Sequence, residues 1–328
     1  MGLDGLLAPK ILVVAGKGGV GRSTVAAALA IVAARRGRKV CIAEVDRKGT
    51  LPRLFGRAPS RYEPSELRPG IWGLTILPEQ ALEEYLEVQY HMKRMSKLFK
   101  STHFVDYITT AAPGLEDILV LGKIWYLEQD RSSGRRDSFD TIIVDAPAAG
   151  HMLSFLSAPM GLSDAVQVGP IKRQADWLVE MLRDPDRTQV HLVTLAEDMP
   201  VAETLETARA LATRVGVSQG VTFANAIYPN IFSRSERTVF RELAEGRERL
   251  DLLTEAEAAG IELDPARLGS LVDYGRWLEA RRAIQARHLR RLRKESAGKV
   301  VELPFIFSAA LDLGDVERLA NAIEERAG

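Results

Sequence analysis

Residues 11–24 read ILVVAGKGGVGRST, a short apolar run rich in β-branched side chains followed by a glycine-rich loop. The next residues, 25–36, are rich in alanine with further aliphatic side chains, so the segment predicts a strand, a glycine loop and a helix in succession. The spacing is that of a phosphate-binding loop, G-x-x-x-x-G-K-[ST], with Arg22 where lysine is usual. A glycine-rich turn without a ligand is disfavoured because a strand and a helix both flank the loop.

The residue types in this loop suit a polyphosphate. Glycines let phosphates approach the backbone closely, and the N–H groups at the helix start then bind their oxygens with help from the helix dipole. Ser23 is placed to ligate Mg²⁺ through its hydroxyl, and Thr24 can reach an inner phosphate. The predicted phosphate-binding residues are Gly16, Lys17, Gly18, Gly19, Val20, Gly21, Arg22, Ser23 and Thr24.

Short β-branched apolar runs alternate with longer stretches of helical spacing along the rest of the chain. This pattern is typical of parallel strands buried on both faces and joined by helices. The candidate strands are 11–15, 39–45, 72–77, 139–144, 165–169, 189–195, 220–224 and 299–303. We therefore predict an α/β fold with a doubly wound, mostly parallel eight-stranded sheet.

Two long helical stretches, 79–137 and 229–298, account for the length of the chain, which exceeds that of a usual single domain. We predict one phosphate-loop domain over residues 1–328, in which both stretches are insertions that form a helical subdomain. Two tandem domains are less favoured because the last strand completes the sheet only after the second insertion.

The composition is that of a globular protein and excludes several classes of function. Lys and Arg number 44, as do Asp and Glu, so no basic field for nucleic acid is expected. The single cysteine, Cys41, excludes disulfides and sites built from several thiolates, and it fits a reducing cytoplasm. The longest apolar run, 25–34, is shorter than the ~18 residues of a membrane span, and residues 1–10 show no targeting signal.

Lys17, second in the loop, makes the segment resemble the deviant phosphate-loop ATPases, K-G-G-x-G-[KR]-[ST]. That group includes nitrogenase iron proteins, chromosome-partition ATPases and the ArsA family of arsenite-transport and tail-anchored-protein targeting ATPases. The resemblance implies that Lys17 reaches across a dimer interface to the partner's nucleotide. A solvated surface lysine is the alternative.

Four further segments favour the ArsA family within this group. Residues 46–56 resemble its first switch, T-D-P-A-H-N-L followed by F-G, and residues 145–151 resemble its second, D-T-A-P-T-G-H. Residues 113–116 are similar to P-G-x-[DE], and residues 196–204 are similar to A-E…E-T. The chain looks most like actinobacterial members that work as unlike pairs.

The resemblance implies Mg·ATP hydrolysis and assigns roles within it. Asp46 would orient the attacking water, Ser23 would ligate Mg²⁺ directly, and Asp145 would hold a water on the metal. Asn225 and Pro304 fall where the family holds adenine, although a turn cap and a strand terminator explain these two residues equally well.

Several departures from the family pattern predict slow turnover. Arg22 keeps a positive charge but replaces a compact ammonium with a larger planar fork, and Ala149 replaces the threonine of the second switch. The predicted catalytic residues are Asp46, Lys17 and Arg22. Two functions stay open: an ATP-hydrolysing dimeric switch acting on a client or partner protein, and a nucleotide-binding regulatory subunit that activates a paralogous ATPase.

The expected partners are a second copy or a paralogue, and a client protein with an apolar helix. Apolar side chains of the first insertion could line a groove for such a helix, but packing within the insertion itself is the favoured alternative. They are Tyr85, Leu86, Tyr90, Met92, Met95, Leu98, Phe99, Phe104, Val105 and Ile108. The basic stretch 276–294 could meet an acidic partner or anionic lipid, and packs more readily as an ordinary amphipathic helix.

Overall fold

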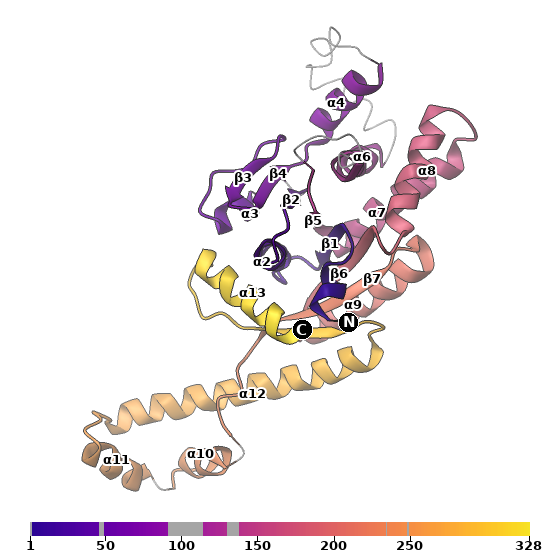
Figure 1. Cartoon of the computed structure of the whole chain (residues 1–328). Helices are drawn as coiled ribbons and strands as arrows, with labels where there is room; N and C mark the ends of the chain where they lie inside the picture. Colours follow the sequence, from indigo (N-terminus) through magenta and orange to yellow (C-terminus); the bar gives the residue numbers. More distant parts are fainter. Residues whose placement is uncertain (1, 46–48, 91–113, 130–137, 234, 248) are drawn as a thin grey trace.

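An eight-stranded sheet forms the centre of the protein (Figure 1). The computed structural model describes residues 2–45, 49–90, 114–129, 138–233, 235–247 and 249–328. The strand order is β3-β4-β2-β5-β1-β6-β7-β8, and only β3 runs antiparallel to its neighbour. The strands are β1 (Ile11–Gly16), β2 (Val40–Glu44), β3 (Ser65–Arg68), β4 (Ile71–Thr75), β5 (Thr141–Ala148), β6 (Thr188–Leu195), β7 (Gln219–Ile227) and β8 (Val300–Pro304). The predicted α/β fold with a mostly parallel eight-stranded sheet is confirmed.

Helices cover both faces of the sheet (Figure 1). One face packs against α1 (Leu3–Leu7), α2 (Arg22–Arg35), α3 (Thr50–Leu54) and α13 (Leu313–Ala327). The other packs against α6 (Leu115–Gln129), α7 (Ala149–Ala165), α8 (Pro170–Arg183) and the π-helical turn η1 (Leu211–Val215) that continues α9 (Asp198–Ala210). The remaining helices are α4 (Pro78–Tyr90), α10 (Glu236–Ala244), α11 (Arg249–Ala258) and α12 (Pro265–Glu295).

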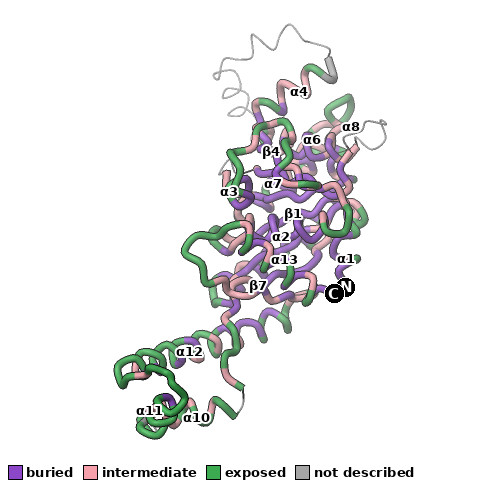
Figure 2. The backbone as a smooth tube through the Cα atoms, turned by 60° about the vertical axis from the view of Figure 1, so that its left-hand side comes forward, coloured by how far each residue is buried: buried purple, intermediate pink, exposed green. Residues whose placement is uncertain are grey.

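Alternation along the central strand divides the core into two layers. In β1, Leu12 and Val14 pack on the α2 side, and Val13 and Ala15 pack on the α7 side. Residues 25–33 of α2 are all buried because this helix lies between the sheet and α13 (Figure 2). Its alanine-rich sequence suits that place, since small side chains let two neighbours approach the helix closely.

The order of the strands positions the site. β1 lies between β5 and β6: the strands that follow it in the chain, β2 to β5, lie on one side of it, and the connection after β5 crosses to β6 on the other side. Open α/β sheets bind ligands outside the carboxyl ends of the strands at such a switch point. The glycine loop leaves β1 at this place.

One predicted strand is wrong and one strand was missed. Residues 165–169 connect α7 to α8, and Val168 is 83% exposed, so these β-branched side chains have no neighbouring strand. The missed strand, β3, has the polar sequence SELR and pairs as an edge hairpin with β4. An edge strand with one open side needs no continuous apolar run, so its pattern carries no strand signal.

The described helices of the two predicted insertions lie at opposite ends of the molecule (Figures 1 and 2). The first insertion follows β4 near one edge of the sheet, and the second follows β7 near the other. This strand order separates α4 and α6 from α10, α11 and α12. Residues 91–113 and 130–137 of the first insertion lie outside the described residues, and a joint subdomain stays a prediction.

Within the described residues, no helix combines the length and the apolar character that crossing a bilayer requires. The longest, α12, has 31 residues and carries arginines along most of its length.

Candidate functional site

The glycine loop joins β1 directly to α2. Gly21 precedes α2 with φ 92°, a left-handed conformation that favours glycine. A Cβ at Gly21 would also lie 2.3 Å from the amide nitrogen of Asn225. Because Gly21 has no side chain to cap α2, the first N–H groups of the helix face the loop without a capping oxygen. The predicted strand, loop and helix are thus present, with Gly18 and Gly19 exposed at the surface.

Ser23 and Asp145 meet beside the loop. The Ser23 hydroxyl, in the first turn of α2, donates a hydrogen bond of 2.5 Å to Oδ2 of Asp145 in the carboxyl-terminal half of β5. Asp145 is 5% exposed. A hydroxyl and a carboxylate are the oxygen ligands that Mg²⁺ takes in proteins, so the donor set fits this ion. Elsewhere, the described residues include no cluster of three or more His, Cys, Asp and Glu side chains that could hold a metal.

Glu44 is a buried acid that the sequence analysis missed. It ends β2, 2% exposed, and its Cα pairs in register with that of Asp145. Glu44 Oε1 accepts a hydrogen bond of 2.8 Å from the Thr50 backbone N–H, while Oε2 is buried with no hydrogen-bond partner in the described part of the chain. The available signal was the one acidic side chain inside the apolar run 39–45.

Arg22 is anchored to the neighbouring strand. Its guanidinium donates to the Ala146 carbonyl of β5, and the residue is 8% exposed. Thr24, in the same turn of α2, is also buried. The large guanidinium is thus held against the backbone at the carboxyl end of β5.

Lys17 pairs with an acid of the same chain. Lys17 Nζ lies 2.8 Å from Glu203 Oε2 on α9, and the two side chains are 41% and 38% exposed. Ion pairs at this exposure contribute about 0–1 kcal/mol. Glu203 belongs to the predicted A-E…E-T segment, so that segment lies beside the loop.

Asn225 also contacts the loop. Its side-chain N–H donates to the Val20 carbonyl over 2.9 Å, which ties the end of β7 to the glycine loop. Pro304, at the end of the adjacent strand β8, pairs with Ile227 at the same carboxyl edge of the sheet. The adenine role of Asn225 and Pro304 stays a prediction. Asp46 lies outside the described residues.

The backbone after Asn225 is strained and held by α12. Ala226 has φ 55°, the one left-handed non-glycine residue in the described ranges, which costs roughly 1–2 kcal/mol. Gln285 of α12 donates to the Ala226 carbonyl over 2.8 Å and accepts from the Tyr228 N–H over 2.9 Å. This double contact fixes the chain next to Asn225, and its long sequence separation hid it from pattern analysis.

The predicted second switch forms the junction of a strand and a helix. β5 ends at Ala148 and α7 begins at Ala149, with no intervening loop. The first turn of α6 lies close by: burial raises the pKa of Asp117, Glu116 adds to the rise, and His151 opposes it. The segment after Gly114 therefore packs near the second switch.

Cys41 lies in the core of the sheet. It is fully buried in β2, and burial raises the pKa of its thiol. A thiol held in its neutral form is a poor ligand for soft metals and metalloids. Among the side chains predicted to form a client groove, Tyr85 and Leu86 are described, and the others lie outside the described side chains.

Comparison with known proteins identifies the family of the chain. The ArsA_ATPase family model, described as an anion-transporting ATPase, matches residues 9–175, slightly more than half of the chain. The ATPase BagA of Mycobacterium tuberculosis is 32% identical over 331 aligned residues, covering 97% of this chain and 93% of that protein. An arsenical pump-driving ATPase of Escherichia coli is 25% identical over 78% of this chain, and one of Acidiphilium multivorum is 26% identical over 67%. These alignments cover 46% and 40% of the two pump-driving proteins, respectively. The glycine loop, the match over half of the chain and the similarity to BagA over nearly its whole length show that the chain belongs to the ArsA_ATPase family.

Proposed function

We propose that the protein is an ATP-binding, Mg²⁺-dependent ATPase that works as a dimeric switch on a client or partner protein. The observation that carries the proposal is the Ser23–Asp145 contact at the start of α2, directly beside the glycine loop. Family membership and the similarity to named ATPases support it. We propose the cytoplasm as its location, because its single thiol suits a reducing compartment.

The residues of the site divide the work of binding. The N–H groups of the loop and of the first turn of α2 bind phosphate oxygens, and Asn225 holds the loop in shape through Val20. Ser23 and Asp145 hold the metal, which when bound neutralises charge on the phosphates. Asp46 orients the attacking water, a role that needs positioning more than basicity.

Lys17 acts between subunits in this proposal. Its ion pair with Glu203 is exposed and weak, so exchanging Glu203 for a phosphate of the partner's nucleotide costs little. The nucleotide would thereby favour a dimer, either of two copies or of this chain with a paralogue.

A second candidate function is supported by Arg22. Its guanidinium donates to the Ala146 carbonyl, which draws the cation toward β5. A misplacement of about 1 Å in a reacting group can cost on the order of 100-fold in rate. The protein would then bind nucleotide with little turnover and act as the regulatory subunit of a paralogous ATPase.

Two measurements test these functions. Calorimetric titration with Mg·ATP should give saturable heat for the wild type, little for Asp145→Asn, and unchanged heat for Asp251→Asn, an acid on the distant helix α11. If the folded wild type gave no heat of binding with Mg·ATP, both proposed functions would be contradicted.

Steady-state phosphate release separates the two candidates. Slow release by the wild type that rises with Arg22→Lys favours the ATPase. Release that stays at background in both proteins, but increases when a paralogue is added, favours the regulatory subunit.

A further inference from the structure

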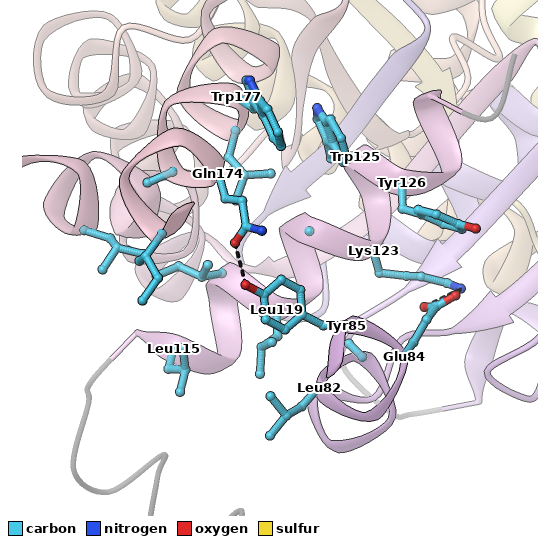
Figure 3. A pocket seen from close by; sticks show the side chains of 17 residues that line it. Leu82, Glu84, Tyr85, Leu115, Leu119, Lys123, Trp125, Tyr126, Gln174 and Trp177 are labelled. Carbon is cyan, nitrogen blue, oxygen red and sulfur yellow. Dashed lines mark hydrogen bonds and ion pairs between the residues drawn. The ribbon is translucent and has the colours of Figure 1, made fainter. Parts of the chain in front are cut away.

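A pocket of about 310 Å³ opens between α4, α6, α7 and α8, on the face of the sheet opposite α2 (Figure 3). Its walls are mainly aliphatic and aromatic side chains, including Leu82, Leu119, Leu162 and Leu178. Its volume is at the lower end of the range of small-molecule sites. None of the residues placed in the nucleotide site lines it.

The charges that line the pocket neutralise each other. Lys123 Nζ lies 2.8 Å from both carboxylate oxygens of Glu84 and 4.4 Å from the ring centre of Tyr62. Lys123 and Glu84 are the charged side chains among the described residues that line the pocket. An anionic ligand would have to separate this pair at the cost of leaving Glu84 without its cation, so the lining favours an uncharged ligand.

One polar contact crosses the pocket. The Tyr85 hydroxyl of α4 donates to Gln174 Oε1 of α8 over 2.7 Å (Figure 3). This bond fixes the Gln174 amide with its nitrogen directed away from Tyr85, and that nitrogen is a donor. It suits a ligand with a carbonyl or another hydrogen-bond acceptor.

Two tryptophans form an aromatic wall. The rings of Trp125 and Trp177 stack with centres 5.3 Å apart and planes 3° apart. Because each indole covers one face of the other, their edges and outer faces remain for contact with a ring of the ligand. The indoles also provide an intrinsic optical probe of the pocket.

Gly122 leaves space where a side chain would otherwise stand. It lies inside α6 and lines the pocket, and a Cβ built on it would meet nothing within 4 Å. Glycine destabilises a helix interior relative to alanine, and neither its backbone conformation nor a close neighbour requires glycine here. The absence of a side chain at this position of α6 enlarges the pocket.

We propose that this pocket binds an uncharged small molecule of one or two rings that carries a hydrogen-bond acceptor. The volume corresponds to on the order of ten to twenty non-hydrogen atoms. A twenty-residue helix, about 30 Å long and 10 Å across, exceeds it several times over. The described pocket therefore suits a compact ligand rather than a whole apolar helix.

Prodan is the probe for this proposal, because it has two fused rings, no charge and a ketone. Titration of the full-length protein without nucleotide should give a saturable blue shift of prodan emission and energy transfer from tryptophan. Gly122→Leu fills the pocket and should weaken binding at least about tenfold. Gly269→Leu, which also adds a side chain in open space within a helix, should bind prodan like the wild type.

Two further comparisons test the chemistry of the site. Gln174→Leu should weaken prodan roughly threefold to tenfold but leave 2-dimethylaminonaphthalene, which lacks the ketone, unchanged. The anionic probe anilinonaphthalene sulfonate should not displace prodan.

Three outcomes would overturn the proposal. They are the absence of saturable prodan binding, equal binding by folded Gly122→Leu, and displacement of prodan by the anionic probe at equal concentration. Because the titrations contain no nucleotide, their failure leaves the proposed ATPase function untouched.

Discussion

At the scale of single residues, acids of two neighbouring strands lie beside the glycine loop. Glu44, the last residue of β2, pairs in register with Asp145 of β5, and both lie on the α2 face, where Ser23 reaches Asp145. Burial of an acid is costly unless a hydrogen bond, a cation or a metal compensates it. Glu44 Oε2 has no hydrogen-bond partner among the described residues, so a ligand near Ser23 would supply the missing compensation for its burial.

Glu44→Gln tests this arrangement. We expect the gain in affinity that Mg²⁺ gives to a fluorescent ATP analogue to fall by roughly tenfold, because outer-shell carboxylates orient metal-bound water. Affinity without Mg²⁺ should stay the same. Glu257→Gln, on the exposed surface of α11, is the matched control. An unchanged Mg²⁺ effect would remove Glu44 from the metal's surroundings.

His191 predicts a pH dependence of stability. It is fully buried in β6, its Nδ1 accepts from the Val221 N–H over 3.0 Å, and burial lowers its pKa to about 4. Below the unfolded value of about 6.5 the unfolded chain binds a proton that the native state refuses, so the free energy of unfolding falls as pH falls. The free energy of unfolding should be lower by roughly 3 kcal/mol near pH 4, and this effect should be absent above about pH 7.

Urea unfolding across this pH range measures the effect. His191→Asn keeps an acceptor near the position of Nδ1 and cannot titrate, so its stability should be lower at neutral pH but change less with acid. Parallel pH curves for the two proteins would contradict the assignment.

At the scale of helices and strands, local signals determine some elements and contacts determine others. The loop from β1 into α2 was predicted correctly because its glycine spacing and its flanking apolar runs are all local. β3 was missed and 165–169 was wrongly predicted because an edge strand and an extended connection differ only in whether a neighbour pairs with them. Whether a neighbouring strand is present depends on the tertiary fold, and a short stretch of sequence does not show it.

The predicted amphipathic stripe within 276–294 divides in the structure. Leu278, Leu289 and Leu292 of α12 are buried, whereas Trp277 and Ile284 are 43% and 47% exposed. The stripe correctly indicated a packing helix. Trp277 and Ile284 stay exposed because only part of α12 packs on β7 and α9.

The capping box of α13 gives a prediction for an element. Asp312 Oδ1 accepts from the Asp315 N–H over 3.0 Å, and the helix packs on α2. Asp312→Ala should lower the free energy of unfolding by about 1 kcal/mol, whereas Asp312→Ser keeps an acceptor and should lose much less. Chemical denaturation measures both, and equal losses would show that capping is not the cause.

At the scale of the whole molecule, contacts between distant segments build the site. Lys17 meets Glu203, and Asn225 meets Val20, across more than half the chain. Sequence patterns predicted that these residues belong to the site, but they could not predict the pairs, which depend on the strand order. Glu44 and Gln285 were missed for the same reason.

The exposed Lys17–Glu203 pair gives a prediction about assembly. Lys17→Ala should reduce nucleotide-dependent association because it removes the cation proposed to act across the interface. Glu203→Gln should leave association intact or strengthen it, since it releases Lys17, and should change stability by less than about 1 kcal/mol. Light scattering with and without Mg·ATP measures the mass. Unaltered association of Lys17→Ala would refute the role between subunits.

The direct passage from β5 into α7 has a mechanical consequence. β5 carries Asp145, and α7, which has 17 residues and follows β5 directly, reaches the pocket through Leu162 near its carboxyl end. No flexible loop separates β5 from α7, so a displacement of one element should be transmitted to the other, although the helix can bend at Pro159. Occupancy of the two sites should then be thermodynamically linked, and the linkage must be reciprocal. Prodan titrations at saturating Mg·ATP should give a different dissociation constant from those without nucleotide, and identical constants would mean that α7 transmits nothing.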